Sequence, residues 1–335
     1  MELTQILTEL AGAFGPPGQE TAVADVIETL AAPYVDEIRR DALGNLIARK
    51  KGPGKRVMFS AHMDSVGAVV TYIDKEGFAR FGAMGGIKLD LALGTLVKFR
   101  DGTRGILCAD GNYAKNKTLS DLYIDVGAAS EDDARKRVAL GDAAVFDQPV
   151  TVRGDTLISP FLDDRIGCAV LIAALADAPR TDSDLYFVFS AQEELGARGA
   201  KTAAYGVEPD YAFSVDVTPV SDTPEAKPKT ECRLGGGAAI HLMDANMIAH
   251  PEIVGYLLAA ADKQGVRVQR QVLRTGGTDA GPIHRSRSGV PTGVIAVPAR
   301  YVHSPQEMCR LSDAQECVKL VRCAMRVDTI YDTML

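Results

Sequence analysis

The sequence contains no tryptophan, and aromatic residues of any kind make up only 6% of it. Tryptophan is the preferred platform for stacking a sugar ring, because it offers a large flat apolar face beside a polar edge. Its absence counts against an enzyme that binds polysaccharides. Paired carboxylates do occur further along the chain, and glycosidases use such pairs. An endoglucanase-type glycosidase is therefore kept as a minor alternative.

Cysteine pairs, a leader peptide and a long apolar run are also missing. The six cysteines form no C-x-x-C pair, which disfavours a zinc ribbon, and a chain of this length rarely depends on a disulfide framework. The opening MELTQILTEL carries Glu2 and polar residues where a signal peptide requires positive charge and then an unbroken apolar run. The longest apolar stretch, residues 168–176, is too short to span a bilayer. We therefore expect a cytoplasmic protein with reduced thiols.

Long basic runs are absent as well. No cluster is longer than Arg49-Lys50-Lys51, and the net charge is −7. Nucleic acids and anionic membranes are bound through basic stripes, so we expect neither as a partner. The remaining composition, 46% hydrophobic and 24% charged, is ordinary for a globular protein. At 335 residues, the length predicts one large domain with an insert, or two domains.

Helical and strand patterns alternate along most of the chain. The first two expected helices, 3–14 and 20–32, are separated by the breaker GPPG. The expected strands are 45–49, 56–60, 185–190 and 211–215, and the later expected helices are 166–178, 197–205 and 314–324. A capping box at Ser312-Asp-Ala-Gln315 marks the start of the last helix. This alternation predicts an α/β fold with a mostly parallel, helix-covered sheet.

Residues 67–159 have a different texture. Short β-rich runs at 68–73, 96–100 and 105–108 are separated by glycine and aspartate turns, and a helical pattern occurs only near 131–138. We expect a small β-barrel or sandwich, inserted into a catalytic domain formed by residues 1–66 and 160–335. No candidate for the chemistry lies within the insert. Its expected role is therefore oligomerisation, with a simple lid as the alternative.

Two histidines and three groups of acids follow expected strands. His62 and Asp64 come just after strand 56–60, and their spacing in extended chain points both side chains the same way. A carboxylate on one imidazole nitrogen orients a histidine that binds a metal through the other. Taken alone, however, the H-x-D pattern is more often a surface turn.

The acids come later in the chain. Asp163-Asp164 precedes a helix, and one of the two is expected to cap it. Glu193-Glu194 lies between a strand and a helix, where one side chain could bind a metal while the other reaches a water; the alternative is two solvated acids in a first helical turn. Asp216 ends the strand FSVD, and His303 follows an apolar run. Because α/β sheets gather their sites at the carboxyl ends of strands, we expect these residues to meet.

Together, these residues have the composition of a dinuclear metal centre. Two divalent cations need about five protein ligands, one of them a bridging carboxylate, and a separate carboxylate takes the proton of the water that the ions activate. Aspartate, glutamate and histidine accept zinc, cobalt or manganese. We expect two divalent metal ions per subunit, Zn or Co in the first place and Mn as an alternative.

Six segments carry a resemblance to a known family. In order they are SAHMDSVG, FLDDRIGC, AQEELGARGA, SVDVTP, GGTDAG and RYVHSPQE, with a β-rich insert after the first. This set closely resembles the M42 family of dinuclear metallo-aminopeptidases over essentially the whole chain. The resemblance implies a zinc-peptidase-like fold and an enzyme that removes N-terminal residues from short peptides. It also implies dimers formed through the insert, and tetrahedral dodecamers built from those dimers.

The resemblance further implies a role for each candidate residue. Asp163 would bridge the two metals, Glu193 would be the general base, and Asp64 would orient the first histidine. The implied metal ligands are His62, Asp163, Glu194, Asp216 and His303.

The segment GGTDAG at 276–281 lacks the Lys-Ser/Thr of a phosphate-binding P-loop. We interpret it as a loop on the substrate side, with Thr278 and Asp279 as candidate substrate contacts. Two alternatives to the aminopeptidase remain. A metal-dependent deacylase or carboxypeptidase on the same scaffold would differ only in which end of the substrate it holds. A glycosidase, in contrast, would have no need of His62 or His303.

Overall fold

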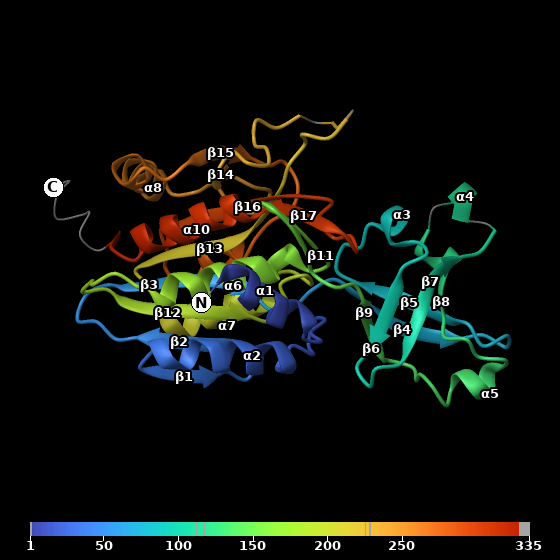
Figure 1. The fold of residues 1–335 in the computed structure, drawn as a ribbon. Coiled ribbons are helices and arrows are strands. Elements are labelled where there is room, and N and C mark those ends of the chain that lie inside the picture. The colour runs from blue at the N-terminus through green and yellow to red at the C-terminus, as the bar shows by residue number, and fades with distance from the viewer. Residues whose placement is uncertain (1, 112, 117, 225, 228, 328–335) are drawn as a thin grey trace.

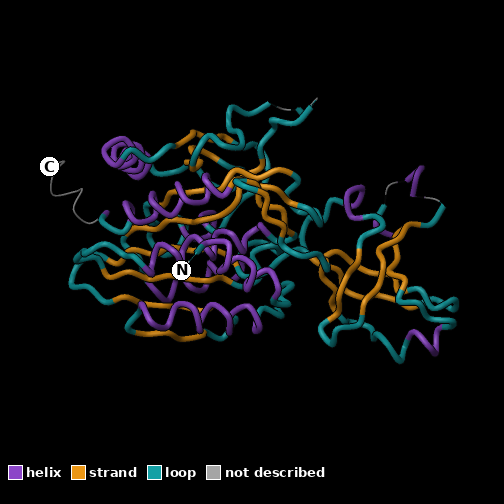
Figure 2. The backbone as a smooth tube through the Cα atoms, viewed as in Figure 1, coloured by secondary structure: helices purple, strands orange, loops and turns teal. Residues whose placement is uncertain are grey.

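The computed structural model describes residues 2–111, 113–116, 118–224, 226–227 and 229–327. They form two units that lie side by side: a large sheet with helices, and a small closed barrel (Figure 1). The long helices lie on the large unit, and the described part of the barrel carries only short helices, as Figure 2 shows. This is the predicted α/β fold with an inserted β-barrel.

The strands of the large sheet are β1 (Glu37–Arg40), β2 (Leu46–Lys50), β3 (Arg56–His62), β10 (Thr151–Arg153), β11 (Thr156–Ser159), β12 (Asp184–Ser190), β13 (Tyr211–Pro219), β14 (Ala238–Met243), β15 (Val268–Val272), β16 (Thr292–Arg300) and β17 (Glu307–Arg310). The strands of the barrel are β4 (Gly67–Ile73), β5 (Ala79–Met84), β6 (Leu96–Phe99), β7 (Arg104–Ala109), β8 (Leu122–Asp125) and β9 (Ala143–Phe146).

The α-helices are α1 (Leu3–Gly12), α2 (Thr21–Ala31), α3 (Leu89–Ala92), α4 (Tyr113–Asn116), α5 (Glu131–Ala134), α6 (Leu162–Ala176), α7 (Arg198–Val207), α8 (Pro251–Gln264), α9 (Ala280–Ile283) and α10 (Leu311–Ala324). Two short 3₁₀ helices are η1 (Ala32–Tyr34) and η2 (Leu119–Asp121). No helix among the described residues combines the length and the apolar character that crossing a membrane requires.

The large sheet is parallel at its centre and antiparallel toward its edges. Its strand order is β1-β2-β12-β3-β13-β16-β17-β11-β10, with β14 and β15 attached through β16. The pairs β12–β3, β3–β13 and β13–β16 are parallel, and the sequence pattern predicted three of these strands, β3, β12 and β13. Parallel strands end at one edge of the sheet, so the segments that follow β3, β12 and β13 are brought together.

Helices bury both faces of the sheet's centre. On one face, the rings of Phe59, Phe187 and Phe213 stack at 5.4 Å between neighbouring strands and pack with helices α1, α2, α6 and α10. On the other face, α7 and α9 cover a smaller apolar cluster around Met58 and Val188. A strand buried on both faces reads as a continuous apolar run, as β3 and β12 do.

The barrel closes in the order β4-β5-β8-β7-β6-β9. Its last strand ends at Phe146, which differs from the insert boundary expected at residue 159. Strands β10 and β11 belong to the large sheet instead, because β11 pairs with β17 over Thr156 to Ser159. Short β-rich runs look alike in sequence, so the pattern could not show that β10 and β11 join the large sheet and not the barrel.

The predicted capping box of the last helix is wrong. Helix α10 begins at Leu311, and no side chain of its own caps it. Ser312 instead donates its backbone N–H and its hydroxyl to the carboxylate of Asp155, at 2.7 and 2.8 Å. The carboxylate that accepts hydrogen bonds from the first turn of this helix therefore comes from the β10–β11 turn, far away in sequence.

Candidate metal centre

Strand register brings the first candidates to one level of the sheet. Ser190 of β12 lies opposite His62 of β3, and Glu193 and Glu194 follow Ser190 directly. Ser214 of β13 lies opposite Ser60, which sets Asp216 level with His62. The predicted meeting of these side chains is therefore a result of parallel pairing.

Asp163 lies between the two histidines. Its Oδ1 is 2.9 Å from Nε2 of His62, and its Oδ2 is 3.2 Å from Nε2 of His303. The backbone of Asp163 and Asp164 is not helical, so the regular part of α6 begins after them, close to the predicted start. The hydrogen bonds with both histidines hold the pKa of Asp163 below its usual range despite burial, which by itself would raise it.

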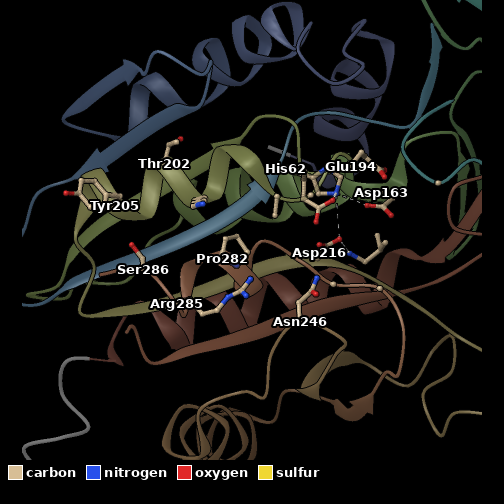
Figure 3. A pocket seen from close by; sticks show the side chains of 18 of the residues that line it. His62, Asp163, Glu194, Thr202, Tyr205, Asp216, Asn246, Pro282, Arg285 and Ser286 are labelled. Atoms are coloured by element: carbon tan, nitrogen blue, oxygen red, sulfur yellow. Dashed lines mark hydrogen bonds and ion pairs between the residues drawn. The ribbon is translucent and has the colours of Figure 1, made fainter. Parts of the chain in front are cut away.

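The remaining candidates divide into two groups around Asp163. Glu194 Oε2 is 3.4 Å from Nε2 of His303, whereas Asp216 Oδ1 is 4.0 Å from Nε2 of His62. Figure 3 shows His62, Asp163, Glu194 and Asp216 at one end of the cavity. A carboxylate with one oxygen toward each group has the geometry of a bridging ligand.

Asp164 lies close enough to His62 and Asp216 to be considered as a further ligand. Both of its oxygens already accept backbone N–H groups, from His62 at 3.2 Å and Gly167 at 3.0 Å. The fully buried Asp164 thus fixes the end of β3 to the start of α6. This is the structural half of the Asp163-Asp164 pair that the sequence led us to expect.

Glu193 faces the same space. Its Oε2 is 4.0 Å from Nε2 of His62, as far as Asp216 Oδ1 is, and its side chain is 15% exposed. The sets of acids and histidines close enough together to share an ion include Asp216 and Glu194 but not Glu193. Burial is the main cause that raises the pKa of Glu193, to about 8. A carboxylate with a pKa near neutrality can both accept and return a proton.

Asp64 lies against His62, as expected, and it also contacts the two glutamates. The imidazole Nδ1 of His62 lies 3.0 Å from the backbone oxygen of Asp64 and 3.5 Å from its carboxylate. The two carboxylate oxygens accept the backbone N–H groups of Glu193 and Glu194, at 2.9 and 3.0 Å. Asp64 therefore orients His62 chiefly through its main chain, and its carboxylate holds the two glutamates in place.

The donor set fits divalent cations. Carboxylates outnumber imidazoles, and burial raises the pKa of Glu194 and of Asp216 well above the ordinary value for each group. Burial alone would lower the pKa of His62, but its hydrogen bond to Asp163 and the acids around it raise it. Glu194 Oε1 is buried without a hydrogen-bond partner among the described residues. Buried, unpaired oxygen donors beside imidazole nitrogens are the ligands that zinc, cobalt and manganese accept.

Glu307 was missed as a site residue, although it lies within the RYVHSPQE segment. It is 1% exposed, and its two oxygens accept the backbone N–H groups of Asp163, at 2.8 Å, and His303, at 2.6 Å. One side chain thus sets the main-chain position of two candidate ligands. The sequence feature that could have identified Glu307 is its position four residues after His303, within the same segment.

Thr278 and Asp279 lie outside the cavity wall. Thr278 is 4% and Asp279 is 1% exposed, and neither lines the cavity that reaches the site. The Oδ2 atom of Asp279 accepts the hydroxyls of Ser60 and Ser190, each at 2.5 Å, beneath the ends of β3 and β12. The geometry therefore does not support a direct substrate contact for either residue. The glycines before them, Gly276 and Gly277, do line the cavity.

A cavity of about 1200 Å³ opens from the candidate ligands. Its far end is lined by Thr202 and Tyr205 of α7 and by Pro282, Arg285 and Ser286 in and after α9 (Figure 3). Volumes of this order accommodate small molecules and short peptides.

Comparisons with known proteins match nearly the whole chain to one protein family. A family model described as M42 glutamyl aminopeptidase matches residues 44–320. A protein of Acetivibrio thermocellus, named provisionally as an aminopeptidase, is 44% identical over 322 residues, covering 96% of this chain and 97% of the relative.

Solved structures agree over the same span. The aminopeptidase APDkam598 from Desulfurococcus kamchatkensis has a TM-score of 0.92 at 35% identity, with 97% of this chain and 94% of that chain covered. The TET1 peptidase of Pyrococcus horikoshii, which can assemble into a tetrahedron or a large octahedral shell, has a TM-score of 0.86 at 31% identity, with 97% and 99% covered.

Proposed function

The chain belongs to the M42 glutamyl aminopeptidase family and is an aminopeptidase, and we propose that it removes N-terminal residues from short peptides at a centre of two divalent metal ions. The observation that supports this proposal most is the position of Asp163, with one carboxylate oxygen beside each of His62 and His303. A single buried carboxylate shared by two imidazoles is what a two-ion site requires and what a one-ion site does not.

The ligands divide between the two ions. His62, Asp163 and Asp216 would hold one, and Asp163, Glu194 and His303 the other. When bound, the ions would acidify a water molecule and polarise the scissile carbonyl. The mixed imidazole and carboxylate donors suit Zn²⁺ or Co²⁺, with Mn²⁺ as the alternative.

Glu193 would be the general base. It would take a proton from the attacking water and return it to the leaving amine, and its burial makes it a stronger base than an exposed glutamate. The hydrogen bond from its backbone N–H to Asp64 holds it beside the ligands. No serine or cysteine nucleophile is needed.

The rival functions have less support. A glycosidase would use a pair of carboxylates across an open sugar site, whereas here the carboxylates converge on two imidazoles, and the chain has no tryptophan. A deacylase or carboxypeptidase shares the metal chemistry. It is separated from an aminopeptidase by which end of the substrate is recognised.

We therefore expect N-acetylation of a good peptide substrate to abolish cleavage, because a free α-amino group is held beside the metals. Amidation of the same peptide's carboxyl end should change the rate little. The measurement compares kcat/KM for free, N-acetylated and C-amidated forms of one tetrapeptide. Cleavage that survives acetylation and fails on amidation would establish the carboxypeptidase alternative.

We also propose that the barrel β4–β9 mediates self-association into dimers and tetrahedral dodecamers. Five of the ten large apolar side chains that are exposed among the described residues lie in this smaller unit: Tyr72, Leu91, Leu96, Ile106 and Leu140. Exposed apolar side chains that gather in a patch are typical of subunit contacts. The tetrahedral assembly of the Pyrococcus horikoshii relative supports the closed form.

Light scattering on the intact protein at micromolar concentration is expected to give a mass many times 35.7 kDa. Substrate size should then be restricted, since sites that face a closed interior admit short peptides and exclude folded proteins. A monomer in this measurement would refute the assembly and leave the metal chemistry untouched.

A further inference from the structure

A loop of the barrel reaches the candidate metal centre, although the insert was expected to supply no residue for the chemistry. After β5 ends at Met84, residues 85–88 pass along His303 before α3 begins. The carbonyl oxygen of Gly86 lies 3.1 Å from Nδ1 of His303, and the backbone N–H of Lys88 donates to the carbonyl oxygen of His303 at 3.0 Å. The loop therefore bonds both the ring and the main chain of one candidate ligand.

Two glycines let this loop approach so closely. A Cβ atom on Gly85 would lie 2.8 Å from Oε2 of Glu194, and Gly85 has a φ of +85°, which side chains rarely adopt. A Cβ atom on Gly86 would lie 3.0 Å from Nδ1 of His303. The ligand atoms nearest to both glycines thus belong to the group formed by Glu194 and His303, and not to that of His62 and Asp216.

The backbone of His303 needs this support. Its φ is +66°, a left-handed conformation that costs a residue with a side chain free energy unless its surroundings impose it. Glu307 accepts its N–H and Lys88 donates to its carbonyl, so the strained residue is fixed from both sides. With Nδ1–H donated to Gly86, Nε2 is the ring nitrogen that faces Asp163 and Glu194 and that would bind an ion placed between them.

We propose that the loop Gly85–Lys88 of the barrel is a positioning element for one metal ion of the pair, the ion held by Glu194 and His303. It fixes the tautomer and orientation of His303 and limits the space open to Glu194. The proposal rests on the proposed two-metal function. Residues that orient a ligand in this way typically contribute about 10- to 100-fold to metal affinity.

The test is the Gly86→Ala variant, which introduces a methyl group against His303 at a position without left-handed strain. Gly82→Ala is the matched control, because its Cβ would meet only Thr71 and Val69, at 3.4 and 3.6 Å. Both variants and the unaltered protein are dialysed against buffered free zinc, and the bound metal is measured. We expect two ions in the unaltered protein and in Gly82→Ala. Gly86→Ala should retain one and regain the second at about 10- to 100-fold higher free zinc. Cobalt substitution should show a changed absorption spectrum for the weakened ion alone.

The outcomes separate the two proposals. An unaltered protein that binds no zinc overturns the two-metal function itself. Two ions held equally tightly by Gly86→Ala, or both weakened together, overturn the positioning role. Should Gly86→Ala fail to fold, Lys88→Pro removes the lysine side chain together with the N–H that donates to the carbonyl oxygen of His303, at a φ of −78° that proline tolerates. Lys88→Ala is its control, because it removes the side chain and keeps the N–H. The same loss of one ion is then expected from proline and not from alanine.

Discussion

Replacing Glu193 by glutamine should lower kcat by about 10²- to 10⁴-fold and leave both metal ions bound. Glutamine keeps the size of the side chain but cannot accept a proton from water. Glu193 lies 4.0 Å from Nε2 of His62 but belongs to neither set of residues that are close enough together to share an ion. Its loss therefore removes the proton transfer and spares the ligands. Turnover and metal content are measured on the same preparation.

Glu9→Gln is a suitable control, because it makes the same chemical change at a residue that is exposed on α1, away from the site. Near-normal turnover by Glu193→Gln would exclude Glu193 as the base. A variant that lost its metal would instead make Glu193 a ligand, and the division between Glu193 and Glu194 would then be reversed.

The parts of this site that the sequence made predictable are those that follow strand ends. His62, the Glu193-Glu194 pair and Asp216 all come after apolar runs, and parallel pairing carries such positions to one edge of a sheet. The prediction that these positions meet therefore needed only the alternation of strands and helices along the sequence. Elements without a chemical motif were overlooked although their signal was present. Helix α8, for example, repeats Ile253, Leu257 and Ala261 at helical spacing.

The rest depended on contacts that no local pattern encodes. Asp64 was expected to orient His62, and it does lie against that imidazole. What the sequence did not show is that its carboxylate also accepts the N–H groups of two residues far along the chain. Asp279 was read as a substrate contact from its glycine-rich surroundings, and it lies instead under the strand ends with Ser60 and Ser190. The same limit applies to Gly86, whose approach to His303 spans 217 residues. Such partners are fixed by tertiary packing, and a turn signal cannot specify them.

The barrel and the metal centre are physically continuous through that approach. Gly86 belongs to the segment after β5, and its carbonyl is a hydrogen-bond partner of a candidate ligand. A barrel that forms subunit contacts would therefore transmit a displacement of β5 to His303 through the two hydrogen bonds that Gly86 and Lys88 make with it. Metal occupancy and assembly are best measured together on the same sample for this reason.

Replacing Asp163 by asparagine should remove both metal ions and lower kcat by roughly 10³-fold or more, because several kcal/mol of transition-state stabilisation depend on the metals. Asparagine offers one neutral oxygen where Asp163 presents two charged ones, 2.9 Å from His62 and 3.2 Å from His303. Asp216→Asn is the comparison, since Asp216 contacts only the His62 side and its loss should cost one ion. Metal bound per chain, measured after dialysis at matched free zinc, should fall from two to none in the first variant and from two to one in the second. If Asp163→Asn also retained one tightly bound ion, Asp163 would serve a single metal. The carboxylate between the two imidazoles would then be a hydrogen-bonding link between them and not a shared ligand.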